Sequence, residues 1–160
     1  MKFTDMDAID RRLLDALQQD ASQSNLALAE RLGISPPTCL RRVRRLRESG
    51  WIAREVAILD SDRIGAVLTA VVEVSLDRQD AQALADFEQR AASDDAVQQC
   101  YRVSPGPDFV LIVTVRDMPA YQAFTQRLFT TDANVRNVKA FFSLKRAKFA
   151  PSVPLPEIEA

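Results

Sequence analysis

Five arginines fall within seven residues of this chain, and apolar residues are threaded between them. Leu40, Val43 and Leu46 recur at a spacing of three, which predicts an amphipathic helix with a buried stripe and a basic face. A guanidinium group donates to phosphate oxygens and can form two parallel hydrogen bonds with a guanine edge. The chemistry open to this segment is therefore recognition of a polyanion, and its cations are Arg41, Arg42, Arg44, Arg45 and Arg47.

The residues before the basic segment predict how it is presented. Residues 26–32 give a short helix one apolar face, and Gly33 can adopt the positive φ that ends a helix. Ser35 is a suitable N-cap, whose side-chain oxygen can accept from a free backbone N–H. Pro36 suits the first helical position, where no donor is lost. A short helix, a tight turn and a basic helix in this order predict a helix-turn-helix that binds double-stranded DNA.

We expect the second helix to run from Pro36 to Ser49 and to stop at Gly50. Cys39 or Leu40 would begin its buried stripe. Side chains on the other faces, and those near the helix start, are then placed to enter a major groove. The residues predicted to contact DNA are Ser35, Pro37, Thr38, Arg41, Arg42, Arg44, Arg45 and Arg47.

The alternative is that the arginines form an ordinary solvated helix face. The charge argues against this alternative, because only Glu48 opposes the five arginines within the helix. Residues 1–54 hold ten Lys and Arg against seven Asp and Glu, whereas residues 55–160 hold eleven against fifteen. The chain as a whole has a net charge of −1, so its basic character is concentrated at the N-terminal end.

Composition excludes several classes of function. The chain has no histidine, which excludes Ser-His-Asp and Cys-His nucleophile systems and histidine-bound zinc. Cys39 and Cys100 are too far apart for a metal motif or a disulfide framework. We therefore predict no catalytic residues, no metal and no cofactor. With no signal peptide and no apolar run long enough to span a membrane, a cytoplasmic protein is expected.

The basic helix belongs to a first domain predicted over residues 1–54. A helix over residues 7–19 precedes the helix-turn-helix and completes a three-helix unit. Residues 51–59 alternate in polarity, which predicts a small wing or a linker strand. Residues 55–65 are expected to connect the domains, and residues 149–160 are rich in proline and predict an extended tail.

Residues 66–148 predict a second domain with the order β-α-β-β-α-β, a ferredoxin-like arrangement. The whole chain is thus α+β. Its sheet has more apolar residues than two helices can cover, so a partner subunit is expected on the other face. The predicted strands cover residues 66–76, 96–104, 109–115 and 134–144, and the predicted helices cover residues 80–92 and 119–129.

These segments resemble the Lrp/AsnC family of prokaryotic transcription factors. The resemblance is carried by DAIDRRLLDALQQDA at 7–21, LAERLGISPPTCLRRVRRLRESGWI at 28–52, DSDRIG at 60–65 and VSPGPDFVLIVTVRDMPAYQAF at 103–124. It implies a winged helix-turn-helix joined to a ligand-sensing ferredoxin-like domain. It also implies dimers that often assemble into tetramers of dimers, and a small-molecule effector, commonly an amino acid, bound between sensing domains of neighbouring dimers.

The resemblance places the effector near the turn after the second strand of the sensing domain. The family usually has Gly-Asp-x-Asp there, whereas this chain has Pro-Gly-Pro-Asp and keeps only the last acid. The turn could equally be a rigid hairpin connection, Tyr121 a packing residue and Asp117 a helix N-cap. The residues expected to bind the effector are Val103, Ser104, Pro105, Gly106, Pro107, Asp108 and Tyr121.

Two other functions stay open at this point. Haem-precursor decarboxylases resemble the same family, but they use histidine, which this chain lacks. An architectural DNA-binding protein without an effector is the second alternative, and the altered turn favours it. For a dimeric regulator, the operator is expected to be an imperfect palindrome.

Overall fold

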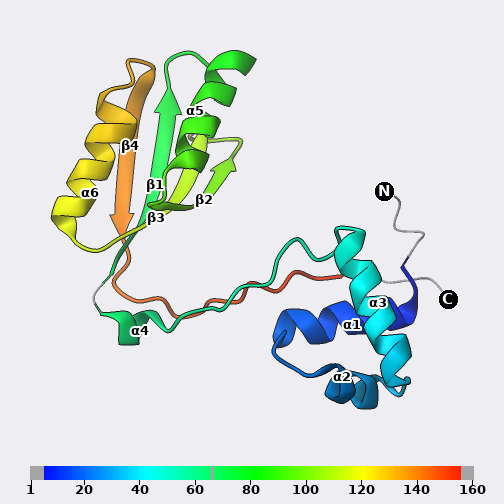
Figure 1. Cartoon of the computed structure of the whole chain (residues 1–160). Coiled ribbons are helices and arrows are strands. Elements are labelled where there is room, and N and C mark those ends of the chain that lie inside the picture. Colours follow the sequence, from blue (N-terminus) through cyan, green and yellow to red (C-terminus); the bar gives the residue numbers. More distant parts are fainter. Residues whose placement is uncertain (1–5, 66, 156–160) are drawn as a thin grey trace. The chain divides into compact units, whose positions relative to one another are not determined.

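The computed structural model describes residues 6–65 and 67–155, with the backbone alone at 61 and 62. The chain divides into two compact units (Figure 1). One comprises Met1–Ile58 together with Lys148–Ala160, and the other comprises Leu59–Ala147. We call them the DNA-binding unit and the sensing unit, after the domains that the sequence predicts, and each is described by itself.

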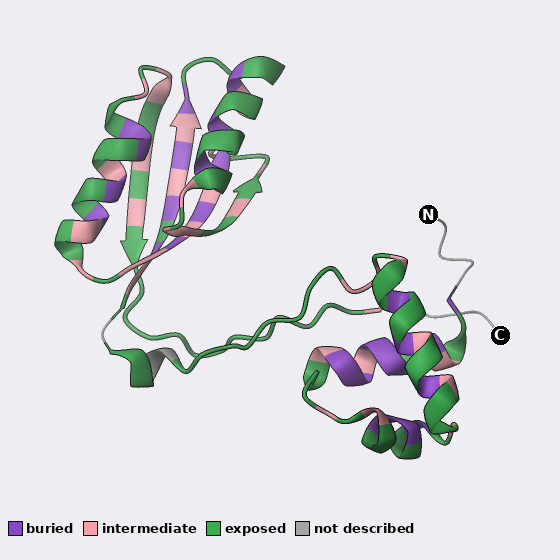
Figure 2. Ribbon diagram, viewed as in Figure 1, coloured by how far each residue is buried: buried purple, intermediate pink, exposed green. Residues whose placement is uncertain are grey.

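Three helices form the DNA-binding unit: α1 (Ala8–Gln19), α2 (Asn25–Leu32) and α3 (Pro36–Glu48). The turn between α2 and α3 is made by Gly33, whose φ of 68° is the left-handed conformation predicted for it. Buried faces of all three helices meet in one core (Figure 2). Its fully or nearly fully buried members include Leu13, Leu17, Leu28, Leu32, Cys39, Val43 and Leu46.

At the start of α3, the structure decides between two predicted residues and corrects one predicted bond. Cys39 is fully buried and Leu40 is 58% exposed, so the stripe begins with Cys39. The predicted cap bond of Ser35 is wrong, because its hydroxyl pairs with the Thr38 hydroxyl at 2.8 Å and makes no bond to a backbone N–H. Pro36 and Pro37 carry no N–H, so Thr38 has the only N–H in the first three helical positions, and the Ser35 oxygen pairs with the Thr38 hydroxyl in its place.

The segment after α3 forms no paired strand. Trp51 and Ile52 donate their backbone N–H groups to the Leu46 carbonyl and pack against the core of the DNA-binding unit. Residues 53–60 belong to no helix or strand, so the strand predicted over 51–59 is not formed. The expected connection continues as one helical turn, α4 (Ser61–Ile64).

The core of the sensing unit is a four-stranded antiparallel sheet and the helices that cover one of its faces. Its strand order is β2-β3-β1-β4, the ferredoxin-like order that the sequence predicts (Figure 1). The elements are β1 (Leu68–Leu76), α5 (Ala81–Ser93), β2 (Val97–Arg102), β3 (Phe109–Val115), α6 (Met118–Thr125), η2 (Gln126–Thr130) and β4 (Val135–Phe142).

The second helix of this unit was predicted to continue to Phe129, but α6 ends at Thr125 and η2 is π-helical. Leu128 and Phe129 are consecutive and both buried. A π-turn is wider than an α-turn, so it can direct both side chains to the core together with Phe124. The pattern of buried residues thus explains the irregular turn.

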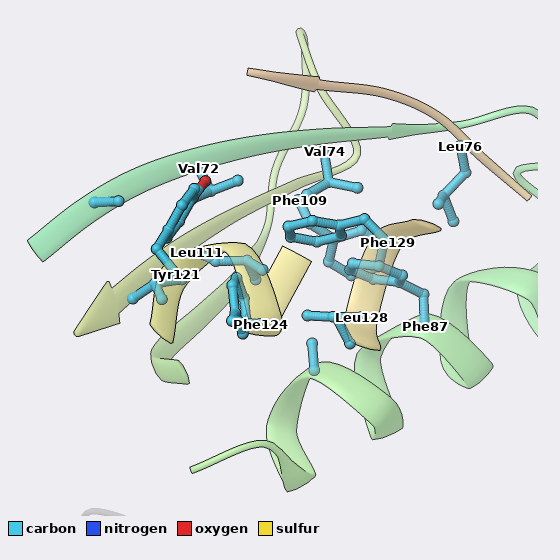
Figure 3. Packing of buried hydrophobic residues seen from close by; sticks show 13 residues of the cluster. Val72, Val74, Leu76, Phe87, Phe109, Leu111, Tyr121, Phe124, Leu128 and Phe129 are labelled. Carbon is cyan, nitrogen blue, oxygen red and sulfur yellow. The ribbon is translucent and has the colours of Figure 1, made fainter. Parts of the chain in front are cut away.

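The two faces of the sheet have different environments. Alternate residues of β1 and β3, such as Val72 and Leu111, are fully buried against α5 and α6, where Phe87, Phe109 and Phe124 fill the core (Figure 3). The opposite face carries an apolar row across the strands, since Val71 of β1 pairs with Ile112 of β3 and with Phe141 of β4. In this row Val71 is 36% exposed and Phe141 is 47% exposed.

Candidate nucleic-acid interface and sensing turn

Helix α3 is attached to the DNA-binding unit by Cys39, Val43 and Leu46, which fixes the direction of its other side chains. At 100° per residue, Pro37, Arg41, Arg44 and Glu48 lie opposite this stripe. All four are exposed (Figure 2). The helix therefore presents a polar ridge with two arginines at its centre.

A buried acid holds one side of α3. Asp10 of α1 is completely buried, and it forms a capping box with Asp7: the Asp10 N–H donates to Asp7 Oδ1 at 2.9 Å, and the Asp7 N–H donates to Asp10 Oδ2 at 3.2 Å. Arg42 donates through Nη1 to Asp7 Oδ2 at 2.6 Å and to Asp10 Oδ1 at 2.9 Å. Arg45 donates to the other Asp10 oxygen. We call Asp7, Asp10, Arg42 and Arg45 the anchor cluster.

The anchor cluster fixes how α3 is rotated about its axis. Arg42 and Arg45 are one turn apart, so two points on the same side of α3 are tied to the start of α1. Partial burial raises the pKa of Asp7, but hydrogen bonds from the Asp10 N–H and from Arg42 outweigh it and lower the pKa below its usual value. The side chain of Arg42 is only 17% exposed, whereas that of Arg45 is 48% exposed. Arg42 thus faces α1, and Arg45 is shared between the cluster and solvent.

The other arginines of α3 have weaker attachments. Arg44 pairs with Glu48 at 2.7 Å, with both side chains more than 60% exposed, and Arg47 pairs with Glu55 at 2.6 Å. Exposed ion pairs contribute about 0–1 kcal/mol, so a phosphate group could replace either glutamate at little cost. Within the part of the chain that the structure describes, Arg41 has no ion-pair partner. Four of the five arginines are therefore paired, and only the two anchor arginines are paired with a buried acid.

Asp7 and Asp10 are not among the residues that the sequence predicts for this interface. A signal was present, since Asp10 precedes Leu13, Leu14 and Leu17 by three, four and seven residues. This spacing places an acid on the buried stripe of α1. A buried carboxylate needs a cation or hydrogen-bond donors, and a run of arginines was available. The partner among them could not be chosen from sequence spacing alone.

Hydrogen bonds of Asp108 hold the turn between β2 and β3 against the end of β1. Its N–H donates to the Val74 carbonyl at 2.9 Å, its Oδ2 accepts from the Leu76 N–H at 2.7 Å, and its carbonyl accepts from the Val103 N–H at 3.1 Å. Gly106 has a φ of 128°, a conformation that favours glycine. The tip of the turn is exposed at Ser104, Pro105 and Gly106, whereas Val103, Pro107 and Asp108 are half-buried.

The structure does not bring Tyr121 to this turn within one chain. Tyr121 is buried between α6 and the sheet, with its ring edge-on to Phe142 at 5.0 Å between centroids (Figure 3). Phe142 pairs with Ala70 near the start of β1, whereas Asp108 bonds to residues near its end. The neighbouring Asp117 accepts from the Ala120 N–H at 2.9 Å, which confirms it as an N-cap.

A cleft of the sensing unit also lies away from the turn, between the C-terminal end of α5 and α6. Its walls include Asp94, Ala120, Ala123 and Arg127. Two of the charges that line it are paired with each other, since Arg127 donates to both Asp94 oxygens at 2.8 and 3.0 Å. These hydrogen bonds hold the pKa of Asp94 below its usual value. The cleft and the turn are thus separate features of the unit.

Comparison with known proteins connects both units to one family. The model of the Lrp/AsnC ligand binding domain matches residues 69–153, which is more than half of the chain. The chain belongs to the Lrp/AsnC family. A winged helix-turn-helix DNA-binding model matches residues 6–53, and so confirms the predicted type of N-terminal domain.

Similar proteins and structures cover nearly the whole chain. The Bkd operon transcriptional regulator of Pseudomonas aeruginosa is 36% identical over 96% of this chain and 100% of its own length. The leucine-responsive regulatory protein of Rhizobium meliloti is 36% identical over 94% of this chain and 97% of its own. The crystal structure of an AsnC family transcriptional regulator from Agrobacterium tumefaciens superposes with a TM-score of 0.85, at 31% identity, over 93% of this chain and 97% of that one.

A second structure includes a ligand. A transcriptional regulator from Neisseria meningitidis, solved in complex with L-methionine, has a TM-score of 0.84 and 28% identity, over 93% of this chain and 96% of that one. This Lrp/AsnC chain is therefore a DNA-binding transcriptional regulator and not an enzyme, which removes the decarboxylase alternative. Among the helices that the structure describes, none combines the length and apolar composition needed to cross a membrane.

The anchor cluster leads to a prediction about stability. Replacing Asp10 by Asn removes the buried charge that pairs with both arginines, while keeping the size of the side chain. We expect D10N to lower the free energy of unfolding of the DNA-binding unit by about 3 kcal/mol, the lower end of the cost of breaking a buried ion pair. Trp51 is the single tryptophan and packs on this unit, so its fluorescence during denaturation measures the change.

The matched control is Glu30→Gln, the same change of acid to amide at an exposed position of α2. It is expected to change the unfolding free energy by less than about 0.5 kcal/mol. Equal stability of D10N and E30Q would show that the anchor cluster does not hold α3.

Proposed function

We propose that α3 inserts into the major groove with Arg41 at the centre of the contact. The observation that carries this proposal is an exposed arginine without an ion-pair partner among the described residues, on a helix whose rotation the anchor cluster fixes. Arg44 and Arg47 would exchange their surface glutamates for backbone phosphates. Ser35, Pro37 and Thr38 would lie against bases near the helix start.

The anchor arginines receive different roles in this proposal. Arg42 is a positioning residue, because its side chain is 17% exposed and its guanidinium is bonded to two carboxylates. Arg45 is half-exposed and keeps donors that Asp10 does not use, so it can reach a phosphate while it is still anchored. The proposed contact surface therefore includes four of the five arginines of α3 and leaves out Arg42.

We further propose that two copies of the chain act together. The open sheet face carries the partly exposed apolar row, and an identical face on a second copy would be a self-complementary partner for it. A dimer would present two α3 helices about 34 Å apart, one turn of DNA, and would select an imperfect palindrome. The support for larger assemblies, such as a tetramer of dimers, comes only from the resemblance to the family.

The sensing unit is proposed to bind an amino acid or a related metabolite at the turn formed by residues 103–108. Support comes from the family of the domain and from the similar Neisseria meningitidis regulator with L-methionine bound. Only Oδ2 of Asp108 is used by Leu76, which leaves Oδ1 for an ammonium group. Binding between neighbouring copies would shift the population of their arrangements and so change DNA affinity. Tyr121 lies away from the turn in its own chain, so it could line the pocket only if it came from a neighbouring copy.

The architectural alternative has one observation in its favour, the proline-rich turn where the family has an additional acid. An effector-free protein would bind DNA with weak sequence preference and would not respond to metabolites. The effector titration below separates the two functions.

The proposed role of Arg41 predicts the behaviour of Arg41→Ala. We expect affinity for operator DNA to fall at least about fivefold, since an arginine at a DNA interface is worth about 1–3 kcal/mol. The slope of log affinity against log salt should flatten by about 0.9 for each phosphate that is no longer neutralised. Fluorescence anisotropy over a salt series measures both. The control Arg136→Ala removes the same charge from an exposed position in β4. Equal affinity and slope in R41A and R136A would refute the assigned face.

The proposed sheet-face interface predicts that Ile112→Glu dissociates the protein. A glutamate in the middle of the apolar row would be buried without a partner in a face-to-face dimer, at a cost of several kcal/mol. Sedimentation velocity should give an oligomer for the wild type and for Gln89→Glu, on the exposed side of α5, and a monomer for I112E. A monomeric wild type, or an I112E variant that stays assembled, would contradict the proposed interface.

Effector sensing is tested on the DNA upstream of the protein's own gene. Anisotropy at fixed salt, with and without each of the twenty amino acids, should show a shift in affinity for one or a few of them. That result would identify the effector class. Tight binding with no shift for any amino acid would contradict amino-acid sensing and favour either a non-amino-acid effector or the architectural alternative.

A further inference from the structure

The C-terminal segment is part of the DNA-binding unit, although the sensing unit precedes it in the chain. Residues from Lys148 onward group with the first helices. The side chain of Gln18 in α1 bonds twice to the backbone of Val153: Nε2 donates to the carbonyl at 3.0 Å, and Oε1 accepts from the N–H at 3.0 Å. Leu155 packs against the apolar core of the same unit.

This contact has the features of a specific peptide site. One amide side chain satisfies both polar groups of one backbone residue, as a neighbouring strand would. Pro151 and Pro154 flank Val153 and restrict the segment to an extended form, so less conformational entropy is lost when it docks. Leu155 adds burial of apolar surface two residues beyond the hydrogen bonds.

We propose that residues 148–155 are a docking segment for α1 of the same chain, and that they make a second tether between the two units. The first connection runs from Ile52 to Leu68, and the second runs from Phe142 at the end of β4 to Val153. Fully extended, these spans reach on the order of 55 Å and 40 Å. The docked tail is the shorter tether, so it sets how far α1 can move from the sheet. The inference does not depend on the effector or on the assigned DNA contacts.

The first test removes the Gln18 side chain, which accepts from the Val153 N–H, and measures amide hydrogen exchange in the tail. Hydrogen exchange by mass spectrometry on a peptide covering residues 150–155 reports few amides, because the two prolines have none. Gln18→Ala should speed exchange of the Val153 amide about fivefold or more, which corresponds to the removal of one net hydrogen bond of about 1 kcal/mol. Gln19→Ala, at the adjacent exposed position, should leave the rate unchanged. Free-peptide exchange in the wild-type tail, or no difference between the two variants, would overturn docking.

A second pair of variants changes the tail instead of α1. Val153→Pro removes the N–H that bonds to Gln18, whereas Val153→Ala keeps it and trims a side chain that is 61% exposed. We expect V153P, but not V153A, to increase the rate at which trypsin cleaves after Lys148. Equal cleavage of the two variants would contradict the role of this hydrogen bond.

The third test asks which copy supplies the tail. Asp15 lies beside Gln18, accepting from its Nε2 at 3.3 Å. In an Asp15→Cys/Val153→Cys double variant, a short bismaleimide should give an intrachain link that neither single variant forms. A covalent dimer specific to the double variant would place the tail on a second copy and overturn the intrachain tether. The absence of any product specific to the double variant would overturn docking itself.

Discussion

A buried carboxylate in α1 determines how this protein can present its basic helix. Asp10 has no exposed surface, so its charge must be compensated within the structure, and α3 supplies the two guanidinium groups that do so. The compensation fixes the rotation of α3 on the helices beneath it. It also divides five adjacent arginines of identical chemistry into a set that holds the helix and a set that faces outward. Positioning and recognition are thus separate tasks within one short segment.

The sensing unit follows a comparable division between its two sheet faces. One face is sealed by α5, α6 and the π-turn η2, whose irregular geometry directs two consecutive apolar residues into the core. The other face keeps an apolar row that no element of the same unit covers among the described residues. Asp108 bonds the turn between β2 and β3 to the end of β1, a central strand. A ligand at this turn would therefore contact a segment that is hydrogen-bonded to the sheet.

The chain passes between the two units twice. The outgoing segment, residues 53–60, has no regular structure, whereas the returning segment ends in a defined contact between Val153 and Gln18. The DNA-binding unit therefore draws on both ends of the sequence. In the proposed tether, the returning segment ends on α1, the helix that carries Asp7 and Asp10.

Features that depend on short-range periodicity follow from the amino-acid sequence without a structure. Apolar spacing predicts the three helices and the β-α-β-β-α-β succession along the chain, Gly33 predicts the turn, and the run from Arg41 to Arg47 predicts the type of partner. Which arginines are anchored depends on tertiary packing, because Asp10 and Arg42 are 32 residues apart and meet only when α1 and α3 pack. Packing within the sensing unit likewise separates Tyr121 from the turn between β2 and β3. Packing within the DNA-binding unit brings Val153 to Gln18, which lies 135 residues earlier. Such long-range contacts leave no periodic signal in a single sequence.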